Sequence, residues 1–121
     1  MENCIFCERE DLFMENDLAW TKFDKYPVSP GHILIISKRH IADFFSTTPE
    51  ERRALNQLLD EAKQILDQKY HPDGYNIGIN CGEDAGQSIM HLHIHLIPRY
   101  RGDLENPKGG VRGVIPGKRG Y

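Results

Sequence analysis

The spacing of apolar residues along the chain predicts four strands. Apolar and β-branched residues gather at 18–23 and again at 32–37, and the prolines and glycine between these segments favour a turn. We expect the two segments to pair as antiparallel strands. Two further strand-like segments cover 75–80 and 90–97, on either side of a glycine-containing loop at 81–86.

One long helix is predicted from about residue 49 to about residue 69. Thr48 suits the N-cap, Pro49 suits the first helical position, and the two glutamates that follow suit the positive end of the helix dipole. Apolar residues then recur at helical spacing: Leu55, Leu58, Leu59, Ala62, Ile65 and Leu66. Several strands and a single long helix predict the α+β class.

Composition narrows the class of protein. A chain of 121 residues fits one compact domain that can bury a core without disulfides. Its net charge of -3 argues against a protein that coats nucleic acid through bulk positive charge. The sequence has no apolar run of membrane-spanning length and no signal-peptide pattern at its start. Three cysteines, an odd number, disfavour a secreted disulfide framework, so we expect a cytoplasmic protein without membrane partners.

Three histidines alternate with apolar residues near the end of the chain. On a strand, His91, His93 and His95 share one face at intervals of ~6.5 Å. The other face is apolar and is expected to join the core: Met90, Leu92, Ile94 and Leu96. Imidazole serves as a nucleophile, an acid, a base or a metal ligand. A metal site, a catalytic array and a polar face without chemistry are all open, although the strict alternation disfavours the last.

The run His91-Leu92-His93-Ile94-His95-Leu96-Ile97 resembles the signature of the histidine triad (HIT) family. Other segments match as well, from Cys4 to about Arg99: Pro30-Gly31-His32-Ile33-Leu34-Ile35, Lys38-Arg39-His40, and Asn80 with Gly86-Gln87-Ser88. The resemblance implies an antiparallel sheet with one long helix, and a homodimer whose sheets join across the interface. It also implies a purine nucleotide site over the histidine strand.

By this resemblance, His93 is the nucleophile that attacks the α-phosphorus of a nucleotide. A covalent nucleotidyl-histidine forms, and water then releases a nucleoside monophosphate. Neutral imidazole is a competent nucleophile near pH 7, provided that its other ring nitrogen donates to an acceptor such as a backbone carbonyl. His95, on the same face, is expected to hydrogen-bond a phosphate oxygen or the leaving group.

The resemblance assigns further substrate contacts. Gln87, which we count as catalytic, and Ser88 are expected to contact phosphate oxygens or the leaving group, and Asn80 helps hold the phosphate. Asp24 is expected to accept hydrogen bonds from the ribose hydroxyls, although an aspartate near Pro27 can also serve a turn. Candidates for packing against the base could equally belong to the core: Phe6, Phe23 and Ile33.

A Cys-x-x-Cys pair lies at the start of the chain. Cys4 and Cys7 supply half of a tetrahedral metal site, but alone the pair could be a redox motif or chance. Some bacterial members of the family complete such a pair with two histidines, which here are His40 and His91. The resemblance therefore implies a structural zinc ion. Cys81 and His32 are expected to be structural.

The chain is expected to divide into a HIT domain with its zinc knuckle at 1–98 and a basic, Gly/Pro-rich tail at 99–121. The tail cations either meet a polyphosphate leaving group or form a solvated surface. Apolar residues within 109–116 favour docking of the tail over disorder.

The expected function is hydrolysis of adenosine-containing phosphates, either dinucleoside polyphosphates or phosphoramidates. A nucleotidylyl transferase is the alternative within enzymes. It is disfavoured because transferases of the family replace the third histidine by glutamine, whereas this chain has His95. A nucleotide-binding adaptor without turnover and a pure metal-binding module also stay open.

Overall fold

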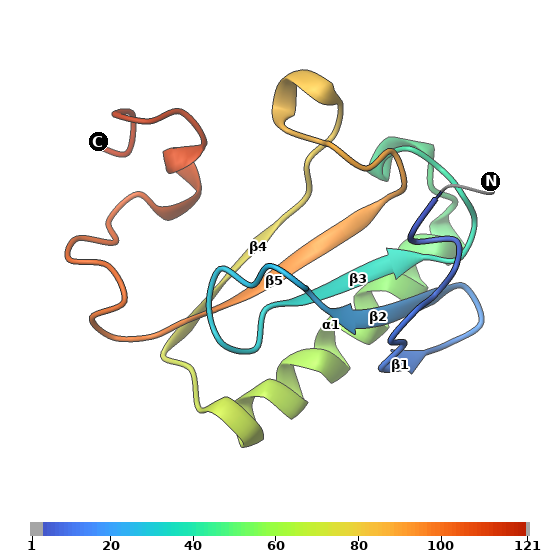
Figure 1. The fold of residues 1–121 in the computed structure, drawn as a ribbon, viewed down its shortest axis with the longest axis horizontal. Coiled ribbons are helices and arrows are strands. Elements are labelled where there is room, and N and C mark those ends of the chain that lie inside the picture. Colours follow the sequence, from blue (N-terminus) through green and yellow to red (C-terminus); the bar gives the residue numbers. More distant parts are fainter. Residues whose placement is uncertain (1–3, 121) are drawn as a thin grey trace.

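The computed structural model describes residues 4–120, which form a five-stranded antiparallel sheet and one long helix (Figure 1). The strand order across the sheet is β1-β2-β3-β5-β4. The strands are β1 (Met14–Glu15), β2 (Ala19–Phe23), β3 (Ile33–Ser37), β4 (Gly74–Gly78) and β5 (His93–Arg99). The helix is α1 (Pro49–Tyr70), and three 3-10 turns are η1 (Phe44–Ser46), η2 (Glu83–Ala85) and η3 (Gly110–Val114). The α+β class is confirmed.

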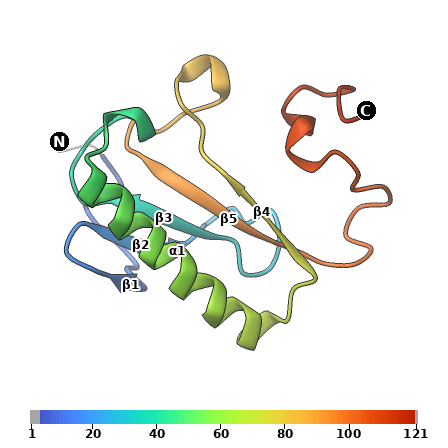
Figure 2. The ribbon, with the colours of Figure 1, turned by 180° about the vertical axis from the view of Figure 1, so that it is seen from behind.

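Helix α1 covers one face of the sheet (Figure 2). Alternate residues of β3 and β5 point toward it, so Ile33, Ile35 and Ile94 lie in one buried cluster with the apolar stripe of α1. Each such side chain contributes about 1.5–3 kcal/mol when fully buried. The opposite face carries a smaller cluster: Phe6, Trp20, Leu34 and Ile36. One face of the sheet therefore packs against α1, and the other packs against Phe6 of the N-terminal segment.

The start of α1 fixes the loop before it. Thr48 and Glu51 form a capping box, in which the Thr48 side chain accepts from the Glu51 backbone and the Glu51 carboxylate accepts from the Thr48 backbone. The same carboxylate receives two bonds from the Arg39 guanidinium, at 2.9 and 2.8 Å. These bonds lower the pKa of Glu51 to about 2. Because Arg39 directly precedes His40, its bonds to Glu51 also anchor the chain next to His40.

The last strand begins later than the sequence predicts. β5 starts at His93 rather than Met90 and continues through Pro98 to Arg99, past the expected domain boundary at residue 98. Met90 is exposed, which corrects its assignment to the core. His91 lies in a bend just before the strand, so only His93 and His95 of the three histidines belong to β5. The strand expected at 75–80 is Gly74–Gly78, and β1 was not predicted.

The C-terminal segment leaves the sheet after β5 and places η3 beside β4 (Figure 1). Its apolar side chains do not pack into this chain, because Val111, Val114 and Ile115 are all exposed. Within residues 4–120, no helix combines the length and apolar character needed to cross a membrane.

Candidate functional site

A pocket of about 340 Å³ opens on the sheet face opposite α1. Strand alternation explains its place: His93 and His95 point away from the helix because Ile94 and Leu96 point toward it. Residues from five segments line it: Ile5, Phe6 and Glu10; Lys22, Asp24, Lys25 and Tyr26; Leu34; Asn80, Gly86, Ser88 and Ile89; and His93 with His95.

His93 has a fixed ring orientation. Its Nδ1 lies 2.8 Å from the backbone carbonyl oxygen of His91, to which only a protonated Nδ1 can donate. A neutral His93 therefore keeps the lone pair on Nε2. The Phe6 ring packs edge-on against the imidazole, with ring centroids 5.0 Å apart. This is the arrangement that the sequence predicts for a nucleophilic histidine.

His95 is oriented by a second histidine that the sequence analysis did not assign to the site. The backbone N–H of Val28 donates to His32 Nδ1 at 3.0 Å, so a neutral His32 carries its proton on Nε2. That nitrogen lies 2.9 Å from His95 Nδ1, which must then accept. The remaining proton of His95 is on Nε2. Burial, with His93 and His32 nearby, lowers the pKa of His95 to about 4, so the ring is neutral at pH 7.

Asp24 lies at the end of the same histidine pair. Its Oδ2 is 3.5 Å from His32 Nε2, and its Oδ1 accepts from the backbone N–H of Tyr26. The carboxylate thus forms the turn contact considered from the sequence and also lines the pocket. Asn80 and Ser88 line the pocket as well.

Gln87 is buried, and backbone groups occupy its amide. The side-chain nitrogen donates to the carbonyl oxygens of Ala42 and Ile89, at 2.6 and 3.1 Å, and the side-chain oxygen accepts from Gly82 at 2.8 Å. Gln87 is not one of the described residues that line the pocket. The structure therefore brings Asp24, Asn80, Ser88, His93 and His95 together, while the Gln87 amide braces the loop before β5.

Two of the three apolar residues considered for base packing lie elsewhere. Phe6 lines the pocket, whereas Ile33 and Phe23 belong to the cluster under α1. Lys22, from the pocket face of β2, is a lining residue that no sequence pattern singled out. Both His32 and Lys22 needed the strand register to be found, because each matters through its cross-strand neighbours.

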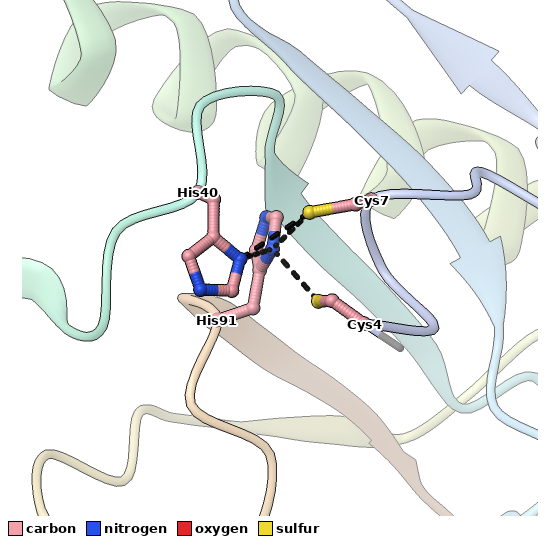
Figure 3. A group of neighbouring side chains, drawn as sticks. All are labelled: Cys4, Cys7, His40 and His91. Atoms are coloured by element: carbon pink, nitrogen blue, oxygen red, sulfur yellow. Dashed lines mark hydrogen bonds between the residues drawn. The ribbon is translucent and has the colours of Figure 1, made fainter. Parts of the chain in front are cut away.

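Cys4, Cys7, His40 and His91 form a compact cluster beside the pocket (Figure 3). His91 Nδ1 lies 3.3 Å from Cys4 Sγ, 3.6 Å from Cys7 Sγ and 3.2 Å from His40 Nδ1, and His40 Nδ1 lies 3.3 Å from Cys7 Sγ. A tetrahedral zinc ion with Zn–S of ~2.3 Å and Zn–N of ~2.05 Å separates its ligand atoms by ~3.3–3.8 Å. The four side chains therefore fit a zinc ion in both spacing and donor type.

The surroundings of His91 support the same role. Its Nε2 lies 2.7 Å from the carbonyl oxygen of Ser37, so a proton on Nε2 leaves Nδ1 free to ligate. Burial lowers the pKa of His91 and keeps the ring neutral, as a metal ligand requires. Burial and the neighbouring Cys4 raise the pKa of the Cys7 thiol, and the positive charge of Arg9 opposes part of this rise.

Comparison with known proteins agrees with these features. The HIT domain profile matches residues 8–102. An uncharacterized HIT-like protein of Mycoplasma pneumoniae is 36% identical over 108 residues, covering 84% of this chain and 75% of that protein. A bis(5'-nucleosyl)-tetraphosphatase of Schizosaccharomyces pombe is 36% identical over 93 residues, covering 77% of this chain and 51% of that enzyme.

A solved structure shows the same fold with a metal. The zinc-bound histidine triad family protein of Mycobacterium smegmatis superimposes with a TM-score of 0.77 at 30% identity, covering 84% of this chain and 78% of that one. The domain match, the relatives and the shared fold agree with the arrangement of histidines on β5. The chain therefore belongs to the HIT, or histidine triad, family.

Proposed function

We propose that this protein hydrolyses nucleoside phosphates at the α-phosphorus through a covalent intermediate on His93. The observation that carries the proposal is the 2.8 Å bond between His93 Nδ1 and the His91 carbonyl, since it leaves the Nε2 lone pair unprotonated in a residue lining the pocket. The bis(5'-nucleosyl)-tetraphosphatase of Schizosaccharomyces pombe, a relative of this chain, is named for such a substrate.

The reaction has two displacements. His93 Nε2 forms a P–N bond as the bond from phosphorus to the leaving group breaks, and water then forms a P–O bond as the P–N bond breaks. The second step releases a nucleoside monophosphate and restores neutral His93. His95, with its proton on Nε2, donates a hydrogen bond to a phosphate oxygen or to the leaving group. Asn80 and Ser88 are further phosphate contacts, and Asp24 contacts the ribose.

The substrate we propose is an adenosine-containing dinucleoside polyphosphate or phosphoramidate, so the enzyme cleaves a phosphoric anhydride or a P–N bond. Gln87 contributes by holding the loop that carries Ser88, through its bonds to Gly82 and Ala42. We also keep Gln87 as a proposed contact to the phosphate or the leaving group, for which its amide would exchange these backbone bonds for bonds to the substrate.

Side-by-side assays of wild type and His93→Ala test the proposal. Release of AMP is followed by chromatography from diadenosine tetraphosphate, diadenosine triphosphate and adenosine phosphoramidate, and AMP binding is measured by calorimetry. We expect wild type to turn over at least one substrate, and His93→Ala to bind AMP without turnover. His71→Asn is the matched control, because His71 is an exposed helix C-cap in a left-handed conformation that asparagine tolerates.

Each failure has its own meaning. Full turnover by His93→Ala would remove His93 as the nucleophile. Nucleotide binding by wild type without AMP release from any substrate would favour an adaptor, or a transferase that passes the nucleotide to another acceptor.

We also propose that Cys4, Cys7, His40 and His91 hold a structural zinc ion, which ties the N-terminal segment to the start of β5. The ion is a cross-link and takes no part in the displacement steps. Metal analysis of untagged protein tests this: His91→Ala should lose stoichiometric zinc, and His93→Ala should keep it. Loss from both variants would make the histidines a common metal array instead.

The quaternary state we propose is a homodimer that continues the sheet. β4 is an edge strand that pairs only with β5 among the described strands, and its Ile77 is exposed. Sedimentation equilibrium at micromolar concentration should give the mass of two chains, and a single-chain mass would exclude the dimer. We propose the cytoplasm as the compartment, because Cys4, Cys7 and Cys81 form no disulfide.

A further inference from the structure

Lys22 is a largely buried lysine that lines the pocket from β2, two strands away from the histidines of β5. Lys22 is only 5% exposed and lies on the pocket face of β2. Within residues 4–120, its ammonium group has no hydrogen-bond or ion-pair partner, although Asp24 lies just past the end of β2 and Glu10 lines the same pocket. The ammonium group lines the pocket without a protein partner, so it is available to an acceptor that arrives with a ligand.

The strand register shows which part of a nucleotide would reach Lys22. Lys22 pairs with Leu34, and Leu34 pairs with His95, so the three residues form one row across the sheet. With neighbouring strands ~4.8 Å apart, the Cα atom of Lys22 lies ~10 Å from that of His95 across the sheet and ~6.5 Å from that of Asp24, the residue that follows β2. On the proposed function, the phosphate lies at His95 and the ribose at Asp24. The base then lies over Leu34, beside Lys22.

We propose that Lys22 makes this pocket prefer a 6-oxopurine, guanine or hypoxanthine, over adenine. An ammonium group has three donors and no acceptor. A 6-oxopurine presents O6 and N7, two acceptors on one edge, whereas adenine presents a donor, its 6-amino group, beside N7. Leu34 and Phe6 supply apolar contact for any base, so discrimination falls to Lys22.

This inference rests on the proposed nucleotide site and departs from the proposed substrate in one respect: the base beside Lys22 is a 6-oxopurine rather than the adenine that the family resemblance implies. Glu10 gives a second way to choose guanine, because a carboxylate accepts from the 2-amino group of guanine. Hypoxanthine separates the two readings: it carries the O6 that Lys22 would contact and lacks the 2-amino group that Glu10 would contact.

The test compares the affinities of GMP, IMP and AMP by calorimetry for wild type, Lys22→Met and Lys25→Met. Methionine keeps an unbranched stem and removes the charge. Lys25→Met removes the same charge from an exposed residue of the same pocket. A hydrogen bond to a charged donor supports a preference of about tenfold. We expect wild type to bind GMP and IMP about tenfold more tightly than AMP, Lys22→Met to bind all three alike, and Lys25→Met to keep the wild-type ratio.

Each contrary result has a definite meaning. Equal affinities in wild type, or an unchanged ratio in Lys22→Met, would overturn the assignment of Lys22 to the base. An equal loss of preference in Lys25→Met would mean general attraction by positive charge. A preference for GMP but not for IMP would also overturn the assignment, because the protein would then recognise the 2-amino group of guanine rather than O6. Failure of wild type to bind any of the three would instead remove the proposed function, while AMP binding by Lys22→Met shows that the variant folds.

Discussion

Replacement of His32 by leucine tests the chain of hydrogen bonds that orients His95. In the native protein, the Val28 N–H fixes the proton of His32 on Nε2, and that proton is donated to His95 Nδ1 over 2.9 Å. Leucine fills much of the same space and cannot donate. His95 then has a buried Nδ1 without its donor, and its ring can turn or take the other tautomer.

The magnitude follows from the bond that is lost. A buried acceptor left without its donor costs about 1–3 kcal/mol. Part of that cost is recovered if His95 rotates toward water in the pocket, so we expect a loss of ~1–2 kcal/mol in transition-state stabilisation. At 1.36 kcal/mol for each factor of ten, kcat/KM should fall ~5–30-fold.

Three measurements separate positioning from simple damage. Steady-state kinetics give the loss for His32→Leu, and His32→Gln should recover part of it, because a glutamine amide can donate toward His95. Imidazole nitrogen NMR should show protonation of His95 on Nε2 in wild type and a mixture of tautomers in His32→Leu. In a His95→Ala background, His32→Leu should cost little further activity.

The reasoning is refuted if His32→Leu keeps kcat/KM within about twofold of wild type while folded. It is also refuted if the loss is as large in the His95→Ala background, since His32 would then act independently of His95.

Three further results are expected. Glu51→Gln should lower the free energy of unfolding by ~1–2 kcal/mol at pH 7. This is below the ~3 kcal/mol that the shift of the Glu51 pKa to about 2 would imply, because its partner Arg39 is half exposed. The contribution of the depressed pKa is complete above about pH 4.5 and is lost as pH falls toward 2, so the difference in melting temperature from wild type should shrink over that range. Gly31→Ala should cost ~2 kcal/mol in urea unfolding, because φ is 89° there and a Cβ would press on α1; a cost near zero would contradict this. Cys7→Ser should lose stoichiometric metal in elemental analysis, while Cys81→Ser should keep it.

The helix was predictable because its signals are local. Thr48 caps it, Pro49 begins it, and the apolar stripe continues to Leu66, so the expected range 49–69 differs from Pro49–Tyr70 by one residue. Antiparallel pairing of the segments at 18–23 and 32–37 was likewise predicted and is present between β2 and β3.

The limits of β5 were not predictable, because tertiary contacts set them. The alternation of histidines and apolar residues extends back to His91. The His91 side chain, however, turns toward Cys4 and Cys7, and its Nε2 donates to the carbonyl oxygen of Ser37. The strand also includes Pro98, opposite Tyr75, although β5 lies inside the sheet where proline is unusual.

The candidate site was predicted where a short motif carries the chemistry. His93 and His95 lie in the pocket as expected. The proton on His95 depends on His32, which is 63 positions away in the sequence and becomes a neighbour only through the pairing of β3 with β5. The position of the Gln87 amide depends on the path of its own loop, which no periodicity describes.

The alternation along β5 separates two kinds of mutational sensitivity within one strand. Ile94 and Leu96 pack under α1, so substitutions there lower the amount of folded protein in a cell before they alter any chemistry. His93 and His95 face the pocket and contribute little to that core, so on the proposed function we expect substitutions there to leave abundance high and to abolish turnover. A saturation library scored separately for abundance and for activity should therefore show two interleaved profiles, each with a period of two residues and out of phase with the other.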